Sequence, residues 1–204
     1  MSRLLGLLAA CCLVLPLAGC NDQDDPSGPE VPGPCFETPD ALVAAFLVLY
    51  TGQDLATYRD NLLAPDYLFV LQPQTVVDFE LPDDVFTFAD EAAIAAAMFS
   101  GQLNARGEVL DSIEVQEFTP QGTWLDVEAT DPNFGDVPGA RVRTYAITMV
   151  FNIVGEQRYE VSGLQLIYVT GDNCHLLGQV DLTGDGKGTE AASWSDIKAL
   201  WRQP

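Results

Sequence analysis

A run of acidic residues and glycines near the C-terminus, VDLTGDGKGTEAASW (180–194), resembles a calcium-binding loop in composition. In an EF-type loop the first, third, fifth and sixth positions would be Asp181, Thr183, Asp185 and Gly186. The twelfth position requires a bidentate carboxylate but holds Ala192, and a strand rather than a helix is expected before the loop. We therefore predict a glycine-rich turn between a strand and a helix, and no metal site.

Other residues with reactive side chains form no recognisable catalytic set. The single histidine, His175, excludes a multi-histidine zinc site. Cys174 and His175 are adjacent on an expected strand, so their side chains point to opposite faces and do not form a nucleophile–base pair. Asp111, Asp126 and Glu128 alternate along expected strands, as on a solvated face. No P-loop, G-x-S-x-G or dinucleotide motif occurs, so we assign no catalytic residue and no cofactor.

The N-terminus, MSRLLGLLAACCLVLPLAGC, has one early positive charge and then a short apolar run, as export signals do. Its last four residues, Leu17–Cys20, resemble the lipobox of bacterial lipoproteins. The resemblance implies cleavage before Cys20, lipidation of Cys20, and a mature protein anchored to a bilayer of the bacterial envelope, facing periplasm or exterior. An ordinary signal peptide cut at a small residue, or an uncleaved anchor, remains the alternative.

Residues 20–34 are predicted to be a disordered tether, because they are rich in proline and acids and hold one large aliphatic residue, Val31. The signal peptide is then 1–19 and the folded domain 35–204. The chain has 30 acidic and 9 basic residues; loss of Arg3 with the signal leaves 8 − 30 = −22. Such a charge repels nucleic acid and argues against a DNA- or RNA-binding role.

Two cysteines, Cys35 and Cys174, remain after removal of the signal and lipidation of Cys20. An exported protein meets oxidising conditions, where such a pair can form a disulfide. A disulfide would join the start of the domain to a late strand. Two separate thiols are the alternative that the sequence leaves open.

The folded part begins with helix patterns. Thr38 as N-cap and Pro39 at the first turn start one helix, which Gly52 ends. A second helix starts at Asp54, a short strand covers 67–71, and a third helix is capped by Asp90. A final helix, SWSDIKALWRQ (193–203), starts with the capping-box pair Ser193 and Asp196 and ends with Lys198 and Arg202 near its negative pole.

Between the third and final helices, the period changes to two, which predicts strands at 109–118, 123–129, 140–154, 157–170 and 174–182. Turns are expected at Val154–Gln157 and Thr170–Asn173. In the longest strand, one side is large and apolar and is predicted to face the helices and line a pocket: Tyr145, Ile147, Met149 and Phe151. The other side is smaller and β-branched, and would be exposed or pair with a second copy: Val142, Thr144, Ala146, Thr148 and Val150.

Helices followed by a meander of long strands predict an α+β fold. Over Phe36–Val180 this order, with the opening LVAAFLVLYTGQDLATYRDNLLAPDYLFVL, resembles the SnoaL-like and nuclear transport factor two-like superfamily. The resemblance implies a cystatin-like cone: a curved antiparallel sheet wrapped around three N-terminal helices, with a pocket inside. The final segment SWSDIKALWR resembles the end of lipoproteins of this type. A lipocalin-like barrel fits three early helices poorly.

Three functions are compatible with these features. The first, which we favour, is a membrane-tethered binding or scaffold domain whose cone pocket is partly filled by its own apolar residues. The second is a pocket enzyme, isomerase- or dehydratase-like, acting on a small hydrophobic molecule. The third is a structural subunit of an envelope assembly that uses the outer sheet face, for instance as a homodimer. A buried acid with a tyrosine opposite would favour the second, and an outer apolar patch the third.

Overall fold

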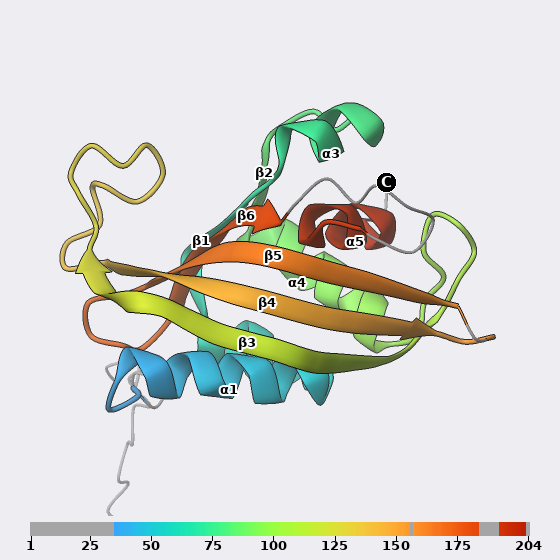
Figure 1. The fold of residues 1–204 in the computed structure, drawn as a ribbon, viewed down its shortest axis with the longest axis horizontal. Coiled ribbons are helices and arrows are strands. Elements are labelled where there is room, and N and C mark those ends of the chain that lie inside the picture. The colour runs from blue at the N-terminus through green and yellow to red at the C-terminus, as the bar shows by residue number, and fades with distance from the viewer. Residues whose placement is uncertain (1–34, 156, 184–191, 203–204) are drawn as a thin grey trace, which may run out of the picture. The chain divides into compact units, whose positions relative to one another are not determined.

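The computed structural model describes residues 35–155, 157–183 and 192–202. The fold is α+β, as predicted: one curved sheet with helices packed on one face and a C-terminal helix (Figure 1). Its helices are α1 (Pro39–Thr51), α2 (Leu55–Thr57), the π-helical turn η1 (Tyr58–Leu62), α3 (Pro73–Asp78), α4 (Phe88–Phe99) and α5 (Trp194–Trp201). Its strands are β1 (Leu63–Val70), β2 (Val85–Thr87), β3 (Leu110–Asp126), β4 (Arg141–Ile153), β5 (Arg158–Val169) and β6 (Leu176–Thr183).

The six strands are ordered β2-β1-β6-β5-β4-β3. Strands β3 to β6 form an antiparallel meander, while β1 pairs with β6 in parallel. The sheet is therefore mixed rather than purely antiparallel. The parallel pair arises because the chain leaves β1, runs through α3, β2 and α4 and the whole meander, and returns beside β1 in the same direction.

The two strands expected at 109–118 and 123–129 are one long strand, β3. Its pairing with β4 shifts register between Val115 and Glu117 and again between Gln121 and Leu125. Gly122 lies in the second shift with φ of 75°, a backbone conformation that favours glycine. Such irregularities bend a strand and increase its twist, so β3 can follow the curved sheet without a break.

The helices form as their caps predict, with one correction. The Thr38 hydroxyl accepts from the backbone N–H of Ala41 at the start of α1, and the Asp54 carboxylate accepts from Thr57 N at the start of α2. The third helix, α4, is capped by Thr87 and not by Asp90. Asp90 instead completes a capping box by accepting from Thr87 N at 3.0 Å. The segment between 71 and α4, for which no helix or strand was predicted, contains α3 and β2.

Helices α1, α4 and α5 cover one face of the sheet, called here the inner face (Figure 1). Their apolar sides and the inner side of the strands form one continuous core. In the part of the chain that the structure describes, no helix is long and apolar enough to cross a membrane.

The opposite, outer face carries a smaller core of its own beneath the loop 127–140, which connects β3 to β4. Phe134 in this loop packs on Tyr168, with ring centroids 4.2 Å apart. Its ring lies so close to Gly178 in β6 that a Cβ there would come within 2.3 Å of Phe134 Cζ. Asp131 holds the loop, accepting from Phe134 N at 2.9 Å and from the Tyr168 hydroxyl at 3.1 Å.

Cys35 and Cys174 are bonded to each other in the structure, 139 residues apart in sequence. The disulfide ties the segment before α1 to the turn between β5 and β6. A backbone hydrogen bond from Phe36 N to Asn173 O, 3.1 Å long, runs beside it. Together these contacts attach the segment before α1 to the turn between β5 and β6.

Candidate functional site

The four residues predicted to line a pocket lie on the inner face of β4, between 0% and 3% exposed. They are members of the main core, not of an open surface. Phe151 packs edge-on against Trp194 of α5, with ring centroids 6.5 Å apart. The inner face at Tyr145, Ile147, Met149 and Phe151 is therefore filled by the chain's own side chains.

At the centre of this filled interior lies a buried ion pair. The Lys198 ammonium, on α5, donates to both carboxylate oxygens of Glu91, on α4, at 2.5 Å each. The Tyr58 hydroxyl donates to Glu91 Oε1 at 2.7 Å. All three side chains are fully buried. A buried charge is tolerated only when it is paired and hydrogen-bonded, and Glu91 meets both conditions.

Aromatic rings surround the ammonium. Lys198 Nζ lies 4.7 Å from the ring centroid of Phe69, 5.6 Å from that of Tyr50 and 5.9 Å from that of Trp194. These distances fall within the range of cation–π attraction. Tyr67 is also buried and lies within the electrostatic influence of Glu91. Its hydroxyl has no hydrogen-bond partner among the described residues.

The burial of these groups changes how they titrate. Loss of hydration lowers the pKa of Lys198, and the Glu91 carboxylate opposes that change in part. Burial raises the pKa of Tyr50, Tyr58 and Tyr67 well above 10, and the negative charge of Glu91 raises each further.

These tyrosines predict a steep loss of stability in alkali. Their raised pKa values mean that the folded state keeps its phenol protons above pH 10 while the unfolded state releases them. Stability present below pH 10 is therefore lost as pH rises above it, by about 4 kcal/mol per pH unit for the three groups together. We expect tyrosinate absorbance to appear only in a cooperative step, together with loss of the circular dichroism signal.

Lys198 changes the pH dependence of stability in the opposite sense. Because its pKa is lowered in the folded state, the folded state releases this proton at a lower pH than the unfolded state does, and stability rises with pH in that range. One such group does not offset three tyrosines. Gradual tyrosinate formation in Tyr50, Tyr58 and Tyr67 near pH 10, with unchanged circular dichroism, would contradict the burial described here.

Helix α5 is held in place at its N-terminal end by groups other than Lys198. Asp181 Oδ2 accepts from Ser195 N at 2.6 Å, and Ser195 Oγ accepts from Gln72 N at 3.1 Å. Thr75 Oγ1 donates to Asp196 Oδ1 at 2.6 Å, and Ser193 and Asp196 form the predicted capping box. Trp194 and Trp201 at its two ends are fully buried.

The predicted calcium-like loop falls mostly on 184–191, outside the described residues. Asp181, its first position, is buried and binds the N-terminus of α5. Among the residues that the structure covers, no group of three or more His, Cys, Asp or Glu side chains is arranged to hold a metal ion.

The sequence predicted Lys198 near the C-terminal end of the final helix, and Lys198 does lie in the last turn of α5. The burial of the Lys198 side chain and its pairing with Glu91 were not predicted. Lys198 follows Trp194 by four positions and precedes Trp201 by three, so it shares their apolar side. Glu91 likewise precedes Ile94 by three positions and Met98 by seven. The sequence therefore contained a signal for a buried ion pair. An acidic residue lies on the apolar side of one helix, and a basic residue lies on the apolar side of another.

The other reactive residues are not brought together. His175 is half-buried in the turn before β6, where its backbone N–H donates to Thr170 Oγ1 at 3.0 Å. Asp111 is exposed at the start of β3. Asp126 and Glu128 are exposed at the other end of that strand.

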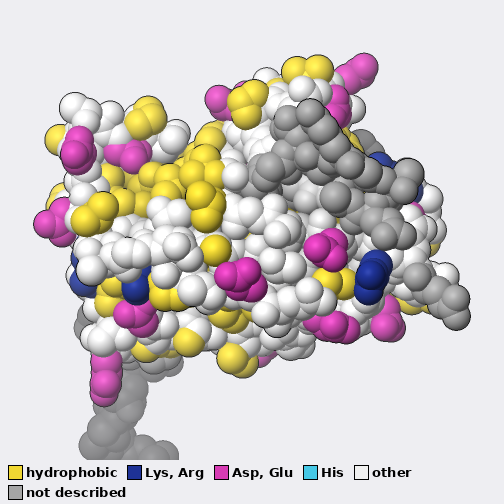
Figure 2. Space-filling model, in the orientation of Figure 1, with side chains coloured by type: hydrophobic (Ala, Val, Ile, Leu, Met, Phe, Trp, Pro, Cys, Tyr) yellow, Lys and Arg dark blue, Asp and Glu magenta, His cyan; other side chains and the backbone are white. Residues whose placement is uncertain are grey.

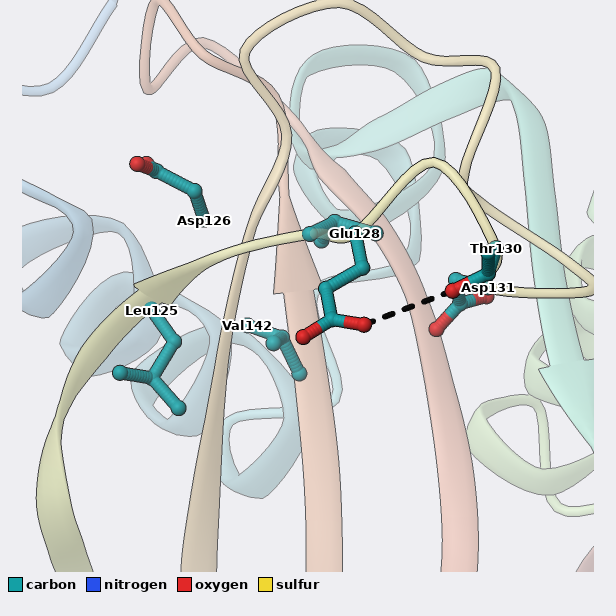
Figure 3. Close-up of a pocket in the computed structure, with 7 residues that line it drawn as sticks. Leu125, Asp126, Glu128, Thr130, Asp131 and Val142 are labelled. Atoms are coloured by element: carbon teal, nitrogen blue, oxygen red, sulfur yellow. Dashed lines mark hydrogen bonds between the residues drawn. The ribbon is translucent and has the colours of Figure 1, made fainter.

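Asp126 and Glu128 border an open hollow of about 280 Å³ on the outer face (Figure 3). Thr130 donates to Glu128 Oε2 across it at 3.4 Å. Leu125 and Val142 form its apolar side, Glu128 and Asp131 lie toward the loop 127–140, and the Asp126 carboxylate points away from them (Figure 3). The ionisable side chains that line it are all carboxylates: Asp126, Glu128 and Asp131.

The outer sheet face also carries an apolar stripe across β3 to β6, which we call the outer band. By strand register it comprises Leu125, Val142, Ala146, Leu164, Leu166, Val180 and Leu182. Leu125 is 62% exposed, Leu164 43% and Leu182 49%. Figure 2 shows apolar side chains gathered on this face next to the loop 127–140.

Sequence comparison finds no matching family model and no matching curated protein. Three solved structures show limited similarity. AusH from Aspergillus nidulans has 9% identity and a TM-score of 0.49, over 83% of this chain and 93% of that one. A nuclear transport factor 2-like superfamily protein from Salmonella enterica serovar Typhimurium has 9% identity and a TM-score of 0.42, over 72% and 89%. A similarly described protein from Cytophaga hutchinsonii has 10% identity and a TM-score of 0.38, over 68% and 89%. At this similarity, no activity or substrate transfers to this chain.

Proposed function

We propose that this protein is a lipid-anchored scaffold domain of the bacterial envelope that binds partners through its outer sheet face. One observation carries the proposal. The inner face, where a pocket was expected, is occupied by α5 and the Glu91–Lys198 pair, while the outer face leaves large apolar side chains in solvent. Exposed apolar patches of this kind mark interaction surfaces.

The alternative of a pocket enzyme has one observation in its favour, a buried acid with a tyrosine beside it. In this arrangement, however, Glu91 already binds an ammonium and a phenol through its oxygens. A general base must reach the proton that it removes. Glu91 reaches only its own protein partners here, so the scaffold function is the better supported one.

The anchor is tested by Cys20→Ala. Because the resemblance places the lipid on Cys20, we expect the variant to lose incorporation of labelled fatty acid and to leave the membrane fraction or remain uncut. Cys12→Ala, which changes a cysteine within the same apolar run, is the matched control and should behave like wild type. Wild-type labelling and fractionation of Cys20→Ala would remove the lipoprotein part of the proposal.

The outer face is tested through self-association, since one partner that fits it is a second copy. The outer band is uncharged, whereas the net charge of the mature chain opposes association most at low salt. We therefore predict a monomer–dimer balance that shifts toward dimer as salt rises, measured by light scattering.

Thr148→Lys places a charge beside the outer band, on the half-buried side of β4 next to Ser162. We expect it to abolish the dimer without unfolding the domain. Ala56→Lys, at an exposed position on α2, makes the same charge change away from the sheet and should leave the dimer intact. A monomer at every salt and protein concentration would remove this partner and leave only other proteins as candidates.

A further inference from the structure

The environment of the Lys198 head has the features of a ligand-binding site. Two carboxylate oxygens accept from the ammonium at 2.5 Å, and the Tyr58 hydroxyl donates to the same carboxylate and holds it in place. Charge-assisted hydrogen bonds of this kind are stronger than neutral ones. The carboxylate comes from α4 and the phenol from η1, so the acceptor side is built without any part of α5.

The remaining walls are aromatic. Phe69 of β1 and Tyr50 of α1 face the ammonium, and Trp194 of α5 lies on a third side. Rings arranged around a cation are a recurrent way of recognising amines. Tyr67 adds a buried hydroxyl with no partner among the described residues, which is a polar group available inside the same cluster.

Among the described residues of α5, Lys198 is the one that donates to the Glu91 carboxylate, while Trp194 contributes a wall. The helix itself is fixed by Ser195, Asp196 and its two tryptophans. Shortening Lys198 to alanine should therefore leave α5 in position. The substitution would remove three methylene groups and the ammonium. The volume that it leaves matches that of n-propylammonium.

We propose that the inner face carries a binding site for primary alkylammonium ions and that Lys198 is its resident occupant. The two oxygens of Glu91 bind the N–H groups, and the rings of Phe69, Tyr50 and Trp194 contact the carbon chain and the charge. The site is separate from the outer band, so it stands or falls independently of the scaffold function.

The test is thermal unfolding of the Lys198→Ala chain with n-propylammonium chloride. A ligand that binds only the folded state raises the melting temperature, and a concentration tenfold above Kd should raise it by about 3–6 °C in a domain of this size. We expect that rise in Lys198→Ala, and none in wild type, at about 100 mM amine. 1-Propanol and tetramethylammonium are the matched probes, because the first lacks the charge and the second lacks N–H donors.

Two variants separate specific binding from a general salt effect. Glu91→Gln/Lys198→Ala lacks the carboxylate and should not respond to the amine. Arg59→Ala removes the exposed Arg59–Asp60 pair and should not respond either. An equal rise in wild type, a rise that persists in the double variant, or a Lys198→Ala chain that stays unfolded in 100 mM amine would each overturn the proposal.

Discussion

Glu91→Ala is expected to lower the free energy of unfolding by about 3–5 kcal/mol, the cost of removing one partner from a buried ion pair. The variant leaves the Lys198 ammonium without its carboxylate at a fully buried position. It also leaves the Tyr58 hydroxyl without its acceptor. Both groups lose hydration without compensation, and a small cavity adds to the effect. Urea unfolding followed by tryptophan fluorescence measures the change.

The same argument predicts that removing both charges costs far less. Glu91→Leu/Lys198→Met replaces the pair with apolar side chains of similar length, and such replacements are often neutral or stabilising. We expect the double variant to be at least about 2 kcal/mol more stable than Glu91→Ala. Asp60→Ala, which breaks the exposed pair with Arg59, should leave stability nearly unchanged, because solvent screens such pairs. Equal costs for Glu91→Ala and Asp60→Ala would mean that the interior pair is hydrated.

Local signals were sufficient to predict the helices that begin at Thr38, Asp54 and Ser193. Each has a side chain that accepts from a backbone N–H of the first turn, which is a property of neighbouring residues. The alternating pattern of β4 similarly identified its inner side, because strand periodicity depends only on the strand itself.

The features that the sequence did not reveal depend on distant partners. The parallel pairing of β1 with β6 joins segments more than a hundred residues apart, and no local pattern specifies it. The burial of Lys198 depends on Glu91, which lies 107 residues away. The packing of Phe134 on Gly178 depends on how a long loop folds back over the sheet. In each case a contact depends on a partner that is distant in the sequence and is brought close only by the fold.

Removing the disulfide is expected to have a similarly large effect. Cys35 and Cys174 close a loop of 139 residues, for which chain entropy gives about 5 kcal/mol of stabilisation. In a domain of this size that corresponds to a fall of about 10–20 °C in melting temperature for Cys35→Ser/Cys174→Ser. The measurement is calorimetry on the wild-type and variant proteins in parallel.

A reducing agent provides the internal control for that variant. Reduction should bring the wild-type melting temperature down to that of Cys35→Ser/Cys174→Ser and leave the double variant unchanged. The bond joins the start of α1 to the β5–β6 turn, where Phe36 N also donates to Asn173 O. Its loss should therefore first increase hydrogen exchange at Phe36 and at the start of α1, while the Glu91–Lys198 interior stays protected. Uniformly increased exchange, or an unchanged melting temperature, would show that the disulfide does not fix the beginning of the domain.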